Sequence, residues 1–221
     1  MQNLVFLPGL DGTAELFKFI KPFFKDFNCM FLKYPANSGF NYFDYVSFVK
    51  KQIEFEKYHV IAESFSGPIA IELCRVDKER VQSMSLVASF AKAPKPKILL
   101  KIGSKLSKIK LPKIICDNIL LNKSSSEVKK ECFEVIKKIS SIDLSCRLDN
   151  MTSFRIDNNL NSVPVLYIQA ANDLLVGKDS LSYIKNKIEN LSVVKIDGPH
   201  LLLQSNPKRS SEVILNFLNE L

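Results

Sequence analysis

Two patterns of apolar residues alternate along most of the chain. Short continuous apolar runs are typical of strands buried on both faces of a sheet. They lie at residues 4–7, 29–33, 59–62, 81–88, 163–170 and 191–197. Apolar residues spaced by three or four positions predict helices between these runs. These helices span residues 16–27, with Pro22 as an interruption, 42–58, 69–76, 178–190 and 210–221.

Strands that alternate with helices predict parallel βαβ units. We therefore expect the α/β class, with a doubly wound, mostly parallel sheet of about six strands. The alternation stops between residues 90 and 160, where lysine-rich, helical and polar segments follow one another. We predict a core of residues 1–90 and 161–221 and an inserted helical, lysine-rich cap of residues 91–160. Such an insertion would lie at the carboxyl end of the sheet, where ligands bind in these folds.

Composition narrows the class of protein. The 221 residues are 46% apolar and 24% charged, as in globular domains, and no apolar run reaches the length of a membrane span. The start of the chain shows neither a basic region nor a cleavage site, so we expect no signal peptide and a cytoplasmic location. Five cysteines without close pairing predict free thiols in a reducing compartment, and no metal site.

Ser64 stands where an apolar run changes abruptly into a helical pattern. A nucleophile elbow needs small residues two positions before and after its serine, because strand and helix nearly touch there. Ala62 and Ser66 are small, although glycine is usual at both positions. Ser66 is the weaker nucleophile candidate, because Pro68 would then occupy the tight position. The alternative is an ordinary strand–helix junction with an N-capping serine.

A serine nucleophile needs a base, and the chain has two histidines. His59 lies on the same strand as Ser64, roughly 16 Å upstream at ~3.3 Å per residue, which favours a structural role. His200 follows the last predicted strand in a Gly-Pro-His loop that can project over the sheet edge. We therefore predict His200 as the base.

The base needs an acid that orients it. Asp173 follows the strand at residues 163–170, among apolar neighbours, and is the predicted acid. Asp179 and Asp197 remain alternatives, although Asp197 is only three residues from His200. For the oxyanion we predict two backbone N–H donors, those of Leu10 and Phe65.

Four segments together resemble the α/β-hydrolase superfamily over nearly the whole chain. They are residues 7–13 as the oxyanion loop, 63–67 as the elbow, 172–173 as the acid loop and 198–200 as the histidine loop. The resemblance implies a Ser–Asp–His triad, no cofactor, and a cap inserted after the sixth of eight strands. The chain lacks the family's first hairpin, so we expect six strands with residues 29–33 at an exposed edge. The chain is then either a minimal member or incomplete at its amino terminus, and the edge could pair two copies, so a monomer or a dimer is expected.

Residues 91–116 contain eight lysines and no acidic residue, which equals the whole net charge of +8. Apolar residues between them have near-helical spacing. Lys97, Lys101, Lys105 and Lys108 are candidates for docking a partner. A solvated cap face, an acidic protein such as acyl carrier protein, and peripheral contact with an anionic membrane remain open. Nucleic acid is disfavoured, because the segment lacks arginine and aromatic residues.

Among capped hydrolases, the chain is similar in size, triad order and basic cap to carboxylesterases that cleave pimeloyl-acyl-carrier-protein methyl ester. This resemblance implies hydrolysis of a carboxylic ester, on a small molecule or on a carrier, through an acyl-enzyme. An acyl thioesterase or lysophospholipase would use the same triad. A catalytically inactive binding protein is the third possibility, because glycine is missing from both elbow positions.

Overall fold

A computed structural model describes residues 1–94, 113–160 and 163–221. Six parallel strands form one sheet in the order β2-β1-β3-β4-β5-β6. The strands are β1 (Asn3–Leu7), β2 (Asn28–Phe31), β3 (Tyr58–Glu63), β4 (Val81–Val87), β5 (Val165–Ala170) and β6 (Leu191–Ile196). The predicted doubly wound, six-stranded α/β fold is confirmed, with β2 at one edge.

The sheet winds outward in both directions from its first strand. β1 pairs with β2 on one side and with β3 on the other. Leu7 lies opposite Ala62 in the β1–β3 register, so the loops that follow these two strands begin side by side. Ligands bind at such switch points in open α/β sheets.

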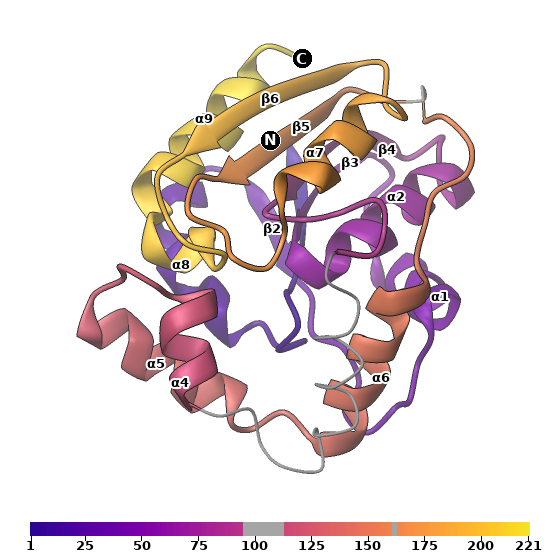
Figure 1. The fold of residues 1–221 in the computed structure, drawn as a ribbon. Helices are drawn as coiled ribbons and strands as arrows, with labels where there is room; N and C mark the ends of the chain where they lie inside the picture. The colour runs from indigo at the N-terminus through magenta and orange to yellow at the C-terminus, as the bar shows by residue number, and fades with distance from the viewer. Residues whose placement is uncertain (95–112, 161–162) are drawn as a thin grey trace.

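Helices cover both faces of the sheet (Figure 1). One face carries α1 (Tyr42–Gln52), α2 (Gly67–Val76) and α7 (Lys178–Lys185). The other face carries two 3-10 helices, η1 (Glu15–Phe19) and η2 (Lys21–Phe24), together with α8 (Leu202–Ser205) and α9 (Pro207–Asn219). The result is three layers with two apolar interfaces.

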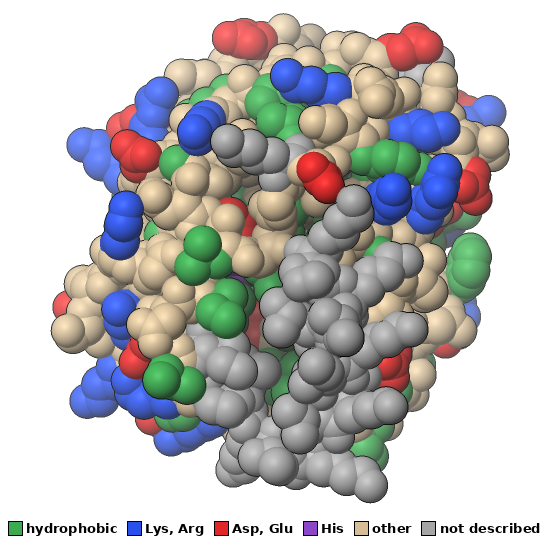
Figure 2. All heavy atoms as spheres, viewed as in Figure 1, with side chains coloured by type: hydrophobic (Ala, Val, Ile, Leu, Met, Phe, Trp, Pro, Cys, Tyr) green, Lys and Arg blue, Asp and Glu red, His purple; other side chains and the backbone are tan. Residues whose placement is uncertain are grey.

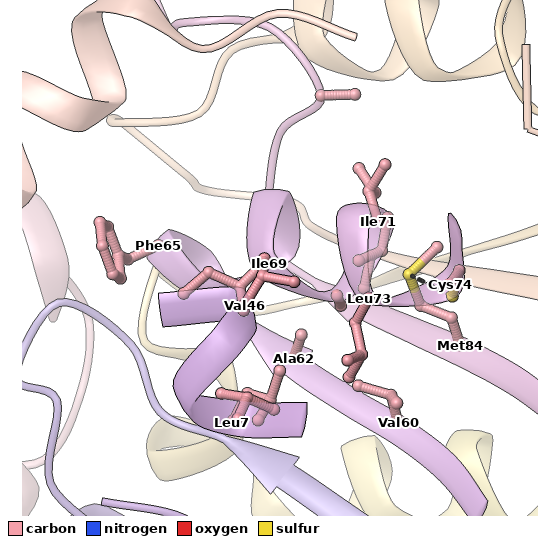
Figure 3. Close-up of a cluster of buried hydrophobic side chains, with 14 of the residues drawn as sticks. Leu7, Val46, Val60, Ala62, Phe65, Ile69, Ile71, Leu73, Cys74 and Met84 are labelled. Atoms are coloured by element: carbon pink, nitrogen blue, oxygen red, sulfur yellow. Dashed lines mark hydrogen bonds between the residues drawn. The ribbon is translucent and has the colours of Figure 1, made fainter. Parts of the chain in front are cut away.

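Alternation along the strands explains the continuous apolar runs. Leu7 and Val60 pack with α1 and α2, whereas Phe6 and Ile61 pack on the opposite face. Figure 3 shows strand side chains, Leu7 and Ala62 among them, close to helix residues of the first face. Each fully buried large apolar side chain contributes about 1.5–3 kcal/mol relative to an exposed one, so both faces hold the sheet.

Three helix predictions need correction at their boundaries. The helix predicted for residues 42–58 ends at Gln52, because Arg80 binds the carbonyl oxygens of Ile53 and Phe55 and holds that segment outside the helix. Residues 16–27 form two 3-10 helices that end at Phe24, and the break between them lies next to Pro22, as predicted. The helix predicted for residues 178–190 ends at Lys185.

Further helices between β4 and β5 lie at one end of the sheet in two separate places, one of them against the core of the first face (Figure 1). They are α4 (Lys113–Ile115), the π-helical η4 (Cys116–Leu120), α5 (Ser126–Ile136) and α6 (Ser141–Ser153). The side chains of Ser125 and Ser140 cap α5 and α6 by accepting hydrogen bonds from backbone N–H groups.

On the face seen in Figure 2, lysine and arginine side chains are interspersed with aspartate and glutamate. Lys97, Lys101, Lys105 and Lys108, the predicted docking residues, lie outside the described residues. Within the described ranges, no helix has the length and apolar character needed to cross a membrane.

Candidate active site

The turn between β3 and α2 is as tight as predicted for an elbow. Ser64 has a φ of 48°, in the left-handed region, and Ala62 and Ser66 are fully buried on either side. A Cβ placed on Gly67 would lie 1.8 Å from the hydroxyl of Ser89. That hydroxyl donates to the carbonyl oxygen of Ser64 over 2.6 Å and so holds the backbone of the turn.

A chain of hydrogen bonds joins the three predicted triad residues. Ser64 Oγ lies 2.7 Å from His200 Nε2, and His200 Nδ1 lies 2.8 Å from Asp173 Oδ2. The other carboxylate oxygen of Asp173 accepts from the N–H groups of Leu175 and Val176, at 2.8 and 2.9 Å. The structure thus brings together residues that are up to 136 positions apart in the chain.

The electrostatic interactions between the triad residues favour an ionised Asp173 beside a basic His200. Burial opposes ionisation of Asp173, but the neighbouring His200 and the hydrogen bonds lower the net pKa of Asp173. Burial lowers the pKa of His200, but the charge of Asp173 and its hydrogen bond more than compensate, so the net pKa is raised. An imidazole with a raised pKa that contacts a hydroxyl through Nε2 has the arrangement of a general base.

The two predicted oxyanion donors belong to the turn of Ser64 and to a loop that approaches this turn. Phe65 is in the first turn of the 3-10 helix η3 (Ser64–Ser66), where N–H groups have no partner inside the helix. Leu10 lies in the loop after β1, and among the described residues no acceptor binds its N–H. A Cβ added to Gly9 would lie 3.9 Å from Ser64 Cβ, so this loop closely approaches the serine.

The remaining candidates lie elsewhere. His59 is buried in β3, with Nδ1 2.8 Å from the Ser83 hydroxyl, in agreement with a structural role. Asp179 and Asp197 are exposed, and His200 Nδ1 has Asp173 as its acceptor.

Sequence reasoning missed a buried carboxyl group next to the serine. Glu63 is 1% exposed, and its Oε2 accepts a hydrogen bond of 3.0 Å from Gln204. The net pKa of Glu63 is raised to about 7: burial is the main cause and nearby Asp11 adds to it, while the hydrogen bond from Gln204 and the charge of His200 act in the opposite direction. Because Glu63 directly follows a run of apolar strand residues, its burial could have been suspected.

Sequence reasoning also missed Arg147, whose guanidinium reaches the loop after β1. Leu144, Leu148 and Met151 are buried at helical spacing around it. A charged residue on an otherwise apolar helix stripe was the available signal. In the described ranges, no cluster of three or more His, Cys, Asp or Glu residues could hold a metal ion.

Comparison with solved structures identifies the fold. An esterase from Exiguobacterium antarcticum superposes with a TM-score of 0.88 at 12% identity, over 99% of this chain and 92% of the other. A lipase-esterase related protein from Clostridium acetobutylicum gives 0.81 at 20% identity, over 98% and 94%. The protein has the α/β-hydrolase fold.

An enol-lactonase from Burkholderia xenovorans is similar to the same extent, with a TM-score of 0.81 at 11% identity over 99% of this chain and 91% of the other. No family model and no curated protein sequence matches the chain. At these identities the likeness establishes the α/β-hydrolase fold, and the activity has to be argued from the site.

Proposed function

We propose that the protein is a serine hydrolase that cleaves a carboxylic ester through an acyl-enzyme. The observation that carries this proposal is the hydrogen-bond chain from Ser64 through His200 to Asp173. The nucleophile, base and orienting acid of acyl transfer need this connectivity. Esterase and lactonase names among the structural neighbours are in keeping with it.

In this proposal Ser64 Oγ attacks the ester carbonyl while His200 Nε2 takes the hydroxyl proton. Asp173 holds the imidazole in the required tautomer and stabilises its positive charge. The N–H groups of Leu10 and Phe65 bind the oxyanion. His200 then protonates the leaving alcohol, and water, deprotonated by the same imidazole, releases the acid and regenerates Ser64.

The test is hydrolysis of p-nitrophenyl esters from C2 to C12 by wild type, Ser64→Ala, His200→Ala and His59→Gln. Wild type should turn over, and Ser64→Ala and His200→Ala should each lose several orders of magnitude in kcat. His59→Gln is the matched control, because its ring lies in the sheet and contacts Ser83. The proposal is wrong if wild type is inactive and Ser64 fails to react with a fluorophosphonate, which would favour a binding protein without catalysis.

The finer proposal concerns the acyl group and its carrier. We propose an ester of a carrier-bound acyl chain, with Lys97, Lys101, Lys105 and Lys108 as a docking site for an acidic acyl carrier protein. Charge complementarity supports this, since residues 91–116 contain eight lysines and no acid. Reversing the charge of Lys97 and Lys101 should raise KM for a carrier-bound ester and leave a free ester unaffected.

The competing possibilities predict other results. A thioesterase with the same triad would prefer the carrier thioester over the oxyester. A membrane role of the lysine-rich segment would appear as salt-sensitive binding to anionic vesicles.

A further inference from the structure

The loop after β1, residues 8–13, is held through its carbonyl oxygens. We keep the name oxyanion loop for these residues, since Leu7 of the expected 7–13 segment ends β1. Within the loop, Gly12 N–H donates to Gly9 O over 3.1 Å. Distant parts of the chain supply the other donors: Ser66 Oγ binds Pro8 O, and the Tyr34 N–H binds Gly12 O over 2.9 Å.

The strongest of these outside donors is Arg147 of α6. Its Nη1 donates to Leu10 O over 2.8 Å and to Asp11 O over 2.9 Å, and its Nε donates to the Tyr45 hydroxyl over 3.1 Å. The side chain is 2% exposed, and its guanidinium lies 5.9 Å from the centre of the Tyr34 ring. Hydrogen bonds from a buried cation are stronger than those between neutral groups, so this contact fixes the loop firmly.

Gly12 shows how closely the guanidinium fits. Its φ is +68°, and a Cβ added to it would lie 2.4 Å from Arg147 Nη1. The space of a side chain at this position is therefore filled by the arginine. A side chain at position 12 would be strained at this φ and would displace the guanidinium of Arg147.

These contacts determine where the Leu10 N–H points. In a trans peptide the N–H of Leu10 is directed opposite to Gly9 O. Gly9 O is turned inward to Gly12 N–H, so the Leu10 N–H faces outward from the turn. Arg147 fixes the next two peptide units by their carbonyl oxygens and so prevents this peptide from rotating.

We propose that Arg147 is a positioning residue for ester hydrolysis, which orients the Leu10 N–H toward the oxyanion without touching the substrate. This inference rests on the proposed function. The role of Arg147 also makes the oxyanion site depend on α6, a helix between β4 and β5. The predicted core, residues 1–90 and 161–221, would then not complete the site alone. Displacement of a catalytic donor by about 1 Å can cost about 100-fold in rate.

The test compares Arg147→Met and Arg147→Lys with Arg80→Met. Arg80 is the matched control, because it also binds backbone carbonyl oxygens, those of Lys50, Ile53 and Phe55, but it precedes β4 at the opposite end of the sheet. Active-site titration corrects each rate for misfolded protein. Arg147→Met should lower kcat by about 10- to 100-fold with KM within about 2-fold. Arg147→Lys should recover only part of kcat, since lysine lacks the planar fork.

Two further readouts separate positioning from general stability. An alkyl boronic acid forms a tetrahedral adduct that places an oxygen in the oxyanion site, so its Kd should rise in Arg147→Met by the factor lost in kcat/KM. Hydrogen exchange at residues 10–13 should accelerate in Arg147→Met and stay unchanged in Arg80→Met.

The outcomes distinguish the two proposals. If wild type neither hydrolyses esters nor binds the boronic acid, the proposed function fails and the role of Arg147 fails with it. If wild type does both, and Arg147→Met keeps its kcat and boronic acid affinity after titration, only the role of Arg147 is overturned. A loss confined to KM would also overturn it.

Discussion

The hydroxyl of Ser66 joins the nucleophile turn to the oxyanion loop, because it donates to the carbonyl oxygen of Pro8. The same hydroxyl is hydrogen-bonded to the Tyr34 hydroxyl. All three groups are buried. A residue that occupies a position where the elbow usually has glycine therefore holds the two halves of the site together.

Replacing Ser66 by Ala should destabilise the fold. The change leaves Pro8 O and the Tyr34 hydroxyl without their common partner, and a buried unsatisfied polar group costs about 1–3 kcal/mol. The midpoint of urea unfolding should fall at unchanged slope. Tyr34→Phe in the Ser66→Ala background should then cost less than in wild type, because its partner is already gone. Equal costs in both backgrounds would show that the two hydroxyls do not interact.

Replacing Asp173 by Asn should reduce kcat by about 10³- to 10⁴-fold, since the imidazole loses the acceptor that selects its tautomer. The charge of Asp173 and its hydrogen bond are also what raises the pKa of His200. The acidic limb of the residual pH–kcat/KM profile should therefore move to lower pH. Activity within 10-fold of wild type would mean that another group orients His200.

Replacing Glu63 by Gln should change stability in a pH-dependent way. Burial raises the pKa of this carboxyl to about 7, from an ordinary value of 4.5. Because the pKa of Glu63 is higher in the folded than in the unfolded protein, the folded state favours the protonated carboxyl. The stability that this proton contributes is fully present below about pH 4.5 and is lost as the pH rises through about 7. The free energy of unfolding of Glu63→Gln, taken relative to that of wild type, should therefore increase by roughly 3 kcal/mol when the pH is raised from 4 to 8.

Denaturant unfolding at those two pH values measures this change. A constant stability difference between the two proteins would contradict the raised pKa. The same substitution removes a negative charge that raises the pKa of His200. The acidic limb of the activity profile should therefore also shift to lower pH, without the large loss of kcat expected of Asp173→Asn.

The parts of the site that could be predicted are those that depend only on which residues directly follow each strand. Ser64, Asp173 and His200 each follow a strand, and a parallel sheet brings the carboxyl ends of its strands to one edge. The backbone positions of Leu10 and Phe65 follow from the same rule. No side chain needs to be known in detail for this step.

The parts that could not be predicted depend on contacts between distant segments. Arg147 binds a loop more than 130 positions earlier in the chain, and only the docking of α6 reveals it. The helix predicted to continue to residue 58 ends at Gln52 because of Arg80, which lies in a later loop. Local periodicity can mark Arg147 as a charge on an apolar stripe, but it does not tell which distant carbonyl oxygens such a donor binds.

The left-handed backbone of Ser64, the proposed nucleophile, brings function and stability into opposition. Its φ of 48° costs a residue with a side chain roughly 1 kcal/mol or more, and glycine would relieve this strain. Selection for a more robust fold alone would therefore tend to remove the hydroxyl. Under the proposed function, serine at position 64 gives up stability in exchange for reactivity.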